Sequence, residues 1–219
     1  MSKITKVIAR QVFDSRGNPT VEAEVFSQNL SASSICPSGA STGTFEAYEK
    51  RDINRKDYKG KSVFNAVKTI NIIIAKKLKN QKVHDQEKID HILLKLDGTK
   101  QKTKLGANSM LAVSMAVKKL SSKIKKIPLY KNFLIKKNFS LPYPLMNIIN
   151  GGVHANNGLQ IQEFMIRPDG ARSFAQAVKM CFLVISNLRK ILKNMNLSTA
   201  VGDEGGFAPM IGSNKQALK

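Results

Sequence analysis

The sequence predicts an α+β domain followed by the beginning of an α/β layer or barrel. Alternating apolar and polar residues open the chain, amphipathic helical patterns follow them, and short apolar runs resume after Pro142 and Pro144. A sheet followed by helices is typical of an α+β domain, whereas strands mixed with helices are typical of an α/β layer or barrel. The second pattern is incomplete, because two or three strands cannot close a barrel.

Period-two alternation indicates the first strands. Between residues 21 and 25, valine and alanine alternate with glutamate, directly after the turn signal Arg-Gly-Asn-Pro. Together with residues 3–13 this segment predicts an opening hairpin, and residues 31–36 predict a possible third strand. The small residues at 37–43 then break the periodicity and predict a flexible loop.

Three helical patterns follow, at about 61–79, 85–96 and 106–125, in which apolar residues recur every three or four positions. We therefore place an α+β domain at residues 1–130. A connector rich in lysine and asparagine is placed at 131–140, and an incomplete second domain at 141–219.

The second domain contains short apolar runs at 145–149, 161–166 and 199–201. A long amphipathic helix is predicted at about 172–195, between the last two runs. This part is therefore expected to alternate strands and helices.

The formal charge of +21 is the unusual feature of the composition, and by itself it would suggest a nucleic-acid partner. Arginine, which reads bases and grips phosphate bidentately, supplies only seven of the 36 basic residues. The remaining basic residues are lysines that fall on the polar sides of predicted helices, where a solvated surface explains them. A nucleic-acid partner is therefore not expected.

The remaining composition favours a cytoplasmic protein without a membrane anchor. Two cysteines, Cys36 and Cys181, are too few for a disulfide framework and show no zinc spacing. The longest strongly apolar run, residues 180–185, is far too short to span a bilayer.

The first segment that suggests chemistry begins at Asn150 with a Gly-Gly turn and reaches His154, then continues to Gln162 and Glu163 at the next strand. A Gly-Gly turn lets the backbone approach a ligand closely, and these three side chains can orient a polar substrate or a water. The alternative is that His154 makes a structural hydrogen bond in a turn and that Glu163 faces solvent.

The second segment is Gly202 to Pro209, in which Asp203 and Glu204 follow an apolar run and precede two glycines. α/β proteins place catalytic groups at the ends of strands, where a carboxylate could ligate a metal or act as a general acid. An Asx-type turn that ends the strand is the alternative.

The third segment is residues 38–43, whose small hydroxyl residues include Ser41. Such residues could close over a phosphate or give an oxygen ligand to Mg²⁺. The Gly-Lys-Ser/Thr ending of a Walker A loop is absent, so a flexible linker is the alternative.

Six segments, in order along almost the whole chain, resemble the enolase family. They are Asp14–Glu22, Pro37–Gly43, Lys104–Ser114, Met146–His154, Gln162–Met165 and Gly202–Pro209. The resemblance implies an α+β N-terminal domain followed by the start of a TIM-like, enolase-type β/α barrel. It also implies a glycolytic lyase that interconverts 2-phosphoglycerate and phosphoenolpyruvate, with two Mg²⁺ ions per site in a homodimer.

Carried over by position, the resemblance assigns a role to five residues. Glu204 corresponds to the general acid that protonates the departing C3 hydroxyl, assisted by His154 and Glu163 with Gln162 close to the substrate. Ser41 corresponds to the loop serine that helps to hold the second Mg²⁺. Sites of the enolase superfamily are a known example of pKa tuning, in which a lysine or histidine base works with one or two Mg²⁺ ions that stabilise the ene-diolate.

Family members are about twice this length, so the resemblance implies that the lysine base, the main Mg²⁺ ligands and the phosphate-binding residues lie in a further segment. A 219-residue chain is therefore expected to be inactive alone and poorly stable beyond residue 140, where apolar surface lacks cover. Two alternatives stay open: a truncated protein that binds RNA or a protein through its basic surface, and a gene remnant without function.

Overall fold

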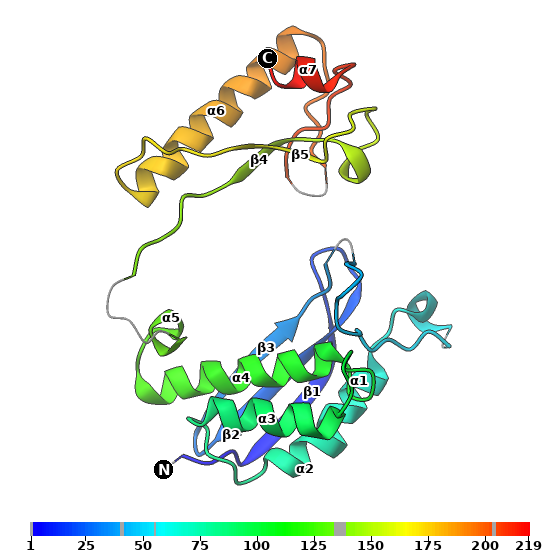
Figure 1. Ribbon diagram of the computed structural model, residues 1–219, viewed down its shortest axis with the longest axis vertical. Coiled ribbons are helices and arrows are strands. Elements are labelled where there is room, and N and C mark those ends of the chain that lie inside the picture. Colours follow the sequence, from blue (N-terminus) through cyan, green and yellow to red (C-terminus); the bar gives the residue numbers. More distant parts are fainter. Residues whose placement is uncertain (1, 40–41, 55, 134–138, 203–204) are drawn as a thin grey trace. The chain divides into compact units, whose positions relative to one another are not determined.

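The computed structural model describes the chain except for residues 1, 40–41, 55, 134–138 and 203–204. The chain divides into two compact units, Met1–Ile135 and Lys136–Lys219. Each unit has its own fold and is described separately (Figure 1). Among the described residues, every helix is too short or too polar to cross a bilayer.

A three-stranded antiparallel sheet forms the base of the first unit, as the alternation predicted. Its strands are β1 (Lys6–Phe13), β2 (Pro19–Ser27) and β3 (Leu30–Cys36), in the order β1-β2-β3. Val21, Ala23 and Val25 are fully buried, whereas the glutamates between them are partly exposed. The apolar face of the central strand therefore points into the core.

The three predicted helical regions are present. The first is continuous but changes its winding, from α1 (Phe64–Lys68) through a π-helical stretch (η2, Thr69–Ile74) to α2 (Ala75–Leu78). The other two are α3 (Gln86–Asp97) and α4 (Ala107–Lys125). A 3-10 turn (η1, Asp57–Gly60) and the short α5 (Leu129–Phe133) were not predicted.

The helices cover one face of the sheet, with α4 packed on β2 and β3 and the η2 stretch packed on β1 (Figure 1). The side chains that meet there are almost all aliphatic, which is the pattern of one continuous hydrophobic core. Its fully buried isoleucines and leucines are Ile4, Ile70, Ile74, Leu78, Ile89, Leu93, Leu105 and Leu120, and valines such as Val21 and Val25 fill the space between them.

The second unit departs from the predicted alternation of strands and helices. Its strands β4 (Met146–Asn150) and β5 (Glu163–Ile166) pair antiparallel, with only a 3-10 turn (η3, Gly152–His154) between them. A parallel pair needs a crossover, usually through a helix, whereas this connection folds back on itself. The prediction of strand-helix alternation was therefore wrong for these two strands.

The remaining elements of the second unit are α6 (Phe174–Asn194), close to its predicted position, and the short α7 (Asn214–Ala217). The predicted strand at 199–201 is not formed. Of these three residues only Val201 pairs, in a single antiparallel bridge to Phe207. Phe207 pairs in addition with Ile149, so this segment lies beside β4.

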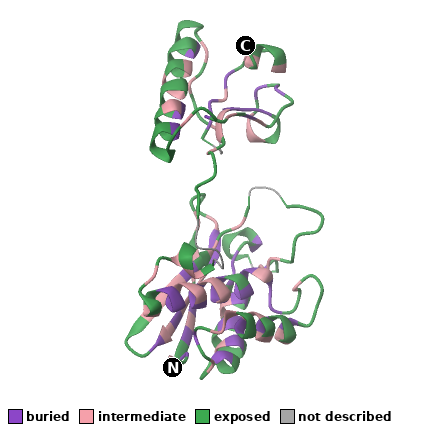
Figure 2. Cartoon of the chain, turned by 60° about the vertical axis from the view of Figure 1, so that its left-hand side comes forward, coloured by how far each residue is buried: buried purple, intermediate pink, exposed green. Residues whose placement is uncertain are grey.

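The second unit has far fewer buried apolar residues than the first, and Figure 2 shows correspondingly few buried residues in it. Its hydrophobic cluster contains Ile149, Leu159 and Phe164. The other buried apolar side chains are those of Phe207 and, on α6, of Ala177, Cys181 and Leu192. Several large apolar side chains of α6 remain exposed, among them Val178, Phe182, Leu183 and Ile191. The folded state of this unit therefore has a smaller hydrophobic contribution to its stability.

The carboxylate of Asp52 accepts hydrogen bonds from N–H groups in the first turn of α1, and its removal should destabilise the first unit. Asp52 is buried and accepts hydrogen bonds from the backbone N–H groups of Phe64 (2.7 Å) and Asn65 (3.2 Å). Asp52→Ala leaves these donors without their partner, so we expect the free energy of unfolding to fall by about 1–3 kcal/mol. Urea unfolding followed by far-UV circular dichroism measures it. Asp52→Asn keeps an acceptor and should lose less; equal stability of Asp52→Ala and the parent would contradict this role.

Asp97 makes the stability of the first unit depend on pH. Burial raises the pKa of Asp97, but hydrogen bonds from the N–H of Leu105 and from Thr99 outweigh it, so the pKa lies below its usual value. The unfolded chain therefore binds more protons, and the free energy of unfolding falls as the pH drops below about 4.

Asp97→Asn removes this titration. At pH 7 we expect it to lower the free energy of unfolding by about 1–2 kcal/mol. The difference from the parent should shrink in urea titrations at pH 3, because Asp97 is then largely protonated in the unfolded chain and its charge in the folded chain stabilises less. A difference that stays constant between the two pH values would show that the carboxylate of Asp97 has an unshifted pKa.

Candidate active site

The connection between β4 and β5 brings three of the predicted site residues together. Its ends are joined by backbone hydrogen bonds from Gly151 to Gln162 (2.9 Å) and from Gly152 to Leu159 (2.7 Å). A side chain at Gly151 would collide with the carbonyl oxygen of Ile161. Glycine is therefore required where the two arms of the connection come closest.

His154 lies at the end of η3 and faces Gln162 and Glu163 on the opposite arm. The amide nitrogen of Gln162 lies 2.7 Å from Nε2 of His154, and a carboxylate oxygen of Glu163 lies 3.5 Å from Nδ1. With the amide nitrogen donating, Nε2 is the acceptor and Nδ1 carries the proton toward Glu163. The three side chains thus form a polar group in which the amide of Gln162 orients the imidazole and the carboxylate of Glu163 lies beside its other nitrogen.

The three side chains differ in their exposure to solvent. The side chain of His154 is 9% exposed and that of Glu163 is 26% exposed, whereas Gln162 is exposed. A ligand could therefore contact Gln162 and Glu163 directly, while the imidazole is held between them and the turn.

The segment around the predicted acid packs against this turn. Asp203 and Glu204 lie outside the described residues, but the residues on both sides of them are described. The N–H of Gly202 donates to the carbonyl of Gly206 (2.9 Å), and the N–H of Phe207 donates to the carbonyl of Ile148 (2.9 Å). A Cβ atom at Gly202 would lie 2.9 Å from the carbonyl oxygen of His154. Gly202 is therefore a direct neighbour of the His154 turn.

Two buried asparagines that sequence reasoning did not single out as site residues connect these segments. The side chain of Asn150, which is fully buried, donates to the carbonyl of Gly206 (2.7 Å). The side chain of Asn157 donates to the carbonyls of Asn150 (2.9 Å) and Pro209 (3.1 Å). Their signal in the sequence was weak, because asparagine beside glycine is also typical of an ordinary turn.

The third predicted segment lies in the first unit. Ser41 is outside the described residues, whereas Ser38 at the start of the same segment is held firmly. The Ser38 hydroxyl donates to Glu49 (2.5 Å) and accepts from Arg51 (2.6 Å), and its carbonyl accepts from Arg16 (2.9 Å). The two arginines and Glu49 thus fix the base of this segment, a function that the sequence motifs did not reveal.

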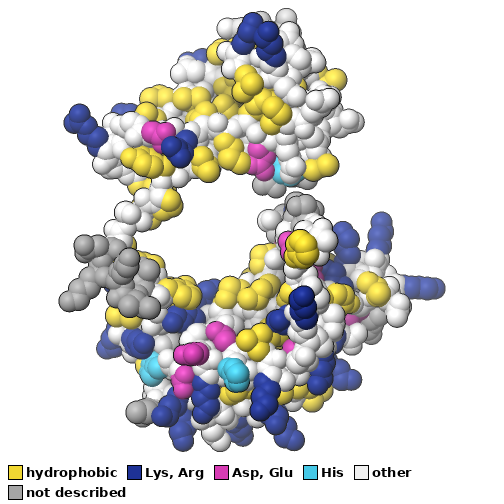
Figure 3. All heavy atoms as spheres, in the orientation of Figure 1, with side chains coloured by type: hydrophobic (Ala, Val, Ile, Leu, Met, Phe, Trp, Pro, Cys, Tyr) yellow, Lys and Arg dark blue, Asp and Glu magenta, His cyan; other side chains and the backbone are white. Residues whose placement is uncertain are grey.

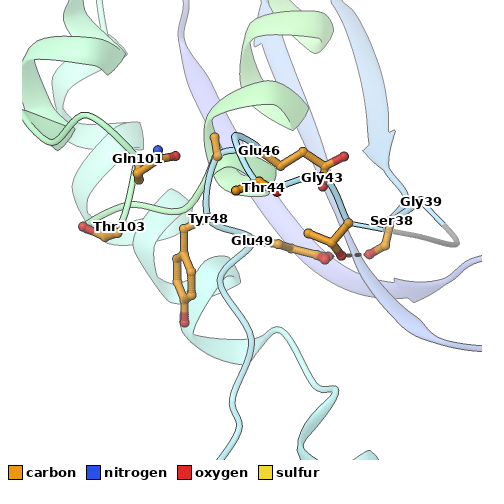
Figure 4. Close-up of a pocket in the computed structure, with 11 residues that line it drawn as sticks. Ser38, Gly39, Gly43, Thr44, Glu46, Tyr48, Glu49, Gln101 and Thr103 are labelled. Atoms are coloured by element: carbon orange, nitrogen blue, oxygen red, sulfur yellow. Dashed lines mark hydrogen bonds between the residues drawn. The ribbon is translucent and has the colours of Figure 1, made fainter.

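A polar cavity of about 610 Å³ opens beside this base (Figure 4). Glu46, Tyr48 and Glu49 line it from one side, and Gln101 and Thr103 line it from the loop before α4. Backbone hydrogen bonds from Tyr48 to Gln101 (2.7 Å) and from Ala107 to Tyr48 (2.8 Å) hold the chain at Tyr48 beside the loop before α4.

The thiol of Cys36 at the end of β3 has a raised pKa. Burial of the thiol is the larger cause, and the Glu49 carboxylate adds to it.

Within the part of the chain that the structure describes, no three His, Cys, Asp or Glu side chains converge to hold a metal ion. His154 and Glu163 are a pair, and a pair of this kind does not fit the oxygen-rich cage that Mg²⁺ prefers. The described residues therefore do not form a magnesium site by themselves.

The basic residues are spread over the first unit and do not gather into one stripe on the face drawn in Figure 3. Some lysines have structural partners. The ammonium group of Lys119 donates to the carbonyl of Ser33 (3.1 Å), and that of Lys123 donates to the carbonyl of Ser31 (3.0 Å). These contacts account for part of the lysine excess without a polyanion.

Comparisons with known proteins agree with the motifs. Residues 4–133 match the family model for the enolase N-terminal domain, and residues 138–219 match that for the enolase C-terminal TIM barrel domain. The chain is 68% identical over 218 residues to the enolase of Pelagibacter ubique (strain HTCC1062). The match covers 100% of this chain and 52% of that enolase, so the chain spans about half of its relative's length.

The first unit accordingly has the fold of an enolase N-terminal domain, and the second is a partial TIM-barrel domain whose sheet is not closed. From the order of its motifs, its two domain matches and its identity to a known enolase, the chain belongs to the enolase family.

Proposed function

We propose that the chain supplies the N-terminal half of an enolase-type lyase, which dehydrates 2-phosphoglycerate to phosphoenolpyruvate reversibly. The observation that carries the proposal is the convergence of His154, Gln162 and Glu163 on one turn, with Gly202 packed against it. In this lyase the domains are residues 1–130 and 141–219, joined by a connector at 131–140. The 219-residue chain alone is inactive.

Glu204 is proposed as the general acid. Hydroxide is a poor leaving group, so the departing C3 hydroxyl needs a proton from a nearby acid. The neighbours of Glu204 in sequence support the assignment, because Gly202 and Gly206 are held beside Asn150 and the His154 turn.

His154, Gln162 and Glu163 are proposed to contact the substrate. Gln162 holds Nε2 of His154, and Glu163 faces Nδ1, so the ring is oriented before a ligand arrives. Orientation of this kind lowers the entropy cost of bringing a proton-transfer group to its substrate.

The reaction also explains why the family uses Mg²⁺. The proton that leaves lies next to an ionised carboxylate, so the intermediate gathers negative charge that nearby cations stabilise. We propose Ser41 as a ligand of the second Mg²⁺, with the other ligands and the lysine base supplied by a further segment. The complete protein is proposed to be a cytoplasmic homodimer.

The first test compares the 219-residue chain with a chain extended to the length of its relative. Formation of phosphoenolpyruvate from 2-phosphoglycerate and Mg²⁺, followed by ultraviolet absorbance, should occur only with the extended chain. There, Glu204→Gln should lower kcat by about 10²- to 10⁴-fold, because the amide cannot give a proton. Turnover by the 219-residue chain that Glu204→Gln abolishes would show that no further segment is needed.

A second test separates the turn from general charge effects. In the extended chain, Glu163→Gln removes the charge that faces His154, and we expect kcat/KM to fall by about 10- to 100-fold. Glu87→Gln makes the same change on an exposed residue in the first turn of α3 and should leave kcat/KM unchanged. Equal rates for the two variants would remove Glu163 from the site.

A further inference from the structure

We propose that Asn157 is a positioning residue that holds the His154 turn against residues 206–209. Its consequence for catalysis rests on the proposed function, whereas its structural effect does not. Asn157 has no place among the residues expected to touch the substrate, and it lies three positions after His154.

The amide of Asn157 joins three separate parts of the second unit. It is 4% exposed. Its nitrogen donates to the carbonyls of Asn150 (2.9 Å) and Pro209 (3.1 Å), and its oxygen accepts from the N–H of Leu159 (3.3 Å). Both amide hydrogens are therefore used, each on a different segment.

Both carbonyls lie where the site is assembled. Asn150 ends β4, its N–H donates to the carbonyl of Phe207 (2.8 Å), and its side chain donates to the carbonyl of Gly206 (2.7 Å). Pro209 lies two residues beyond Phe207. Asn157 thus ties the turn to the end of β4 and to the chain at Pro209, just beyond the residues that pair with Asn150.

Aspartate at position 157 could not donate to both carbonyls as asparagine does. Aspartate has the shape of asparagine but presents only acceptors when ionised, so it would repel both carbonyls. A buried charge beside two carbonyl dipoles is unfavourable. The two segments should then separate, and the ring of His154 should lose its fixed orientation.

The test is Asn157→Asp in the 219-residue chain, with Asn187→Asp as the matched control. Asn187 lies in the same unit on α6, is exposed, and donates within its own helix to the carbonyl of Leu183 (3.0 Å). The N–H groups of Asn150 and Phe207 make the hydrogen bonds that join β4 to the segment at Phe207. NMR hydrogen exchange at these two groups therefore measures how firmly the two segments are held together. The imidazole signals measure the orientation of His154, and the chain has only three histidines.

In Asn157→Asp we expect exchange at these two amides to be at least about tenfold faster and the His154 ring signals to shift. Amides of β2 in the first unit should be unchanged in both variants. Asn157→Ser is the milder variant, because serine is uncharged but too short to reach both carbonyls. It should also speed exchange at these two amides, and it gives the test if the buried charge of Asn157→Asp unfolds the whole second unit.

The proposal fails if Asn157→Asp and Asn157→Ser exchange like Asn187→Asp, within about twofold. It also fails if Asn150 and Phe207 are unprotected in the parent while amides of α6 are protected, because the side chain of Asn157 then does not hold the two segments together. If α6 is unprotected as well, the same comparison is made in the extended chain. In the extended chain Asn157→Ser should lower kcat about tenfold with KM nearly constant. Absence of turnover in the extended parent would overturn the proposed function and leave the exchange result standing.

Discussion

The antiparallel return from β4 to β5 is the constraint on which the candidate site depends, and buried amide groups make it possible. A connection that folds back into the unit buries backbone carbonyls, and each of these needs a donor. Asn150 and Asn157 supply donors to the carbonyls of Gly206, Asn150 and Pro209. Because the same hydrogen bonds join two segments distant in sequence, satisfying the backbone also assembles the site.

Helices protect both edges of the sheet in the first unit. Beside β1, the side chain of Asn71 from the π-helical stretch pairs with both the N–H (2.7 Å) and the carbonyl (3.1 Å) of Ala9. Beside β3, Lys119 and Lys123 of α4 donate to carbonyls of the strand. Open strand edges invite pairing with other chains, and lysines along an edge oppose it. Part of the strongly basic composition therefore belongs to the fold of the first unit.

The two units contribute different things. The first has an extensive aliphatic core, and it fixes the base of the 37–43 segment through Arg16, Glu49 and Arg51. The second holds the polar turn on a small core and leaves apolar side chains of α6 exposed. A partial barrel has this character, because the helices around a barrel bury their apolar faces on a closed ring of strands, and the sheet of this unit is not closed.

The sequence by itself determined the three strands and the three main helical regions of the first unit, the position of α6 and the membership in the enolase family. Periodicity sufficed there because it records which face of a strand or helix is buried. It does not record strand direction, so the antiparallel pairing of β4 with β5 and the loss of the strand at 199–201 came only from the structure.

The candidate site divides in the same way. Motifs identified His154, Gln162 and Glu163, since their residue types and glycine-rich surroundings are local properties of the sequence. The partners of Asn157, by contrast, lie at Asn150 and Pro209. Tertiary folding decided these contacts, because a buried amide finds its acceptors among whichever backbone groups packing brings within about 3 Å.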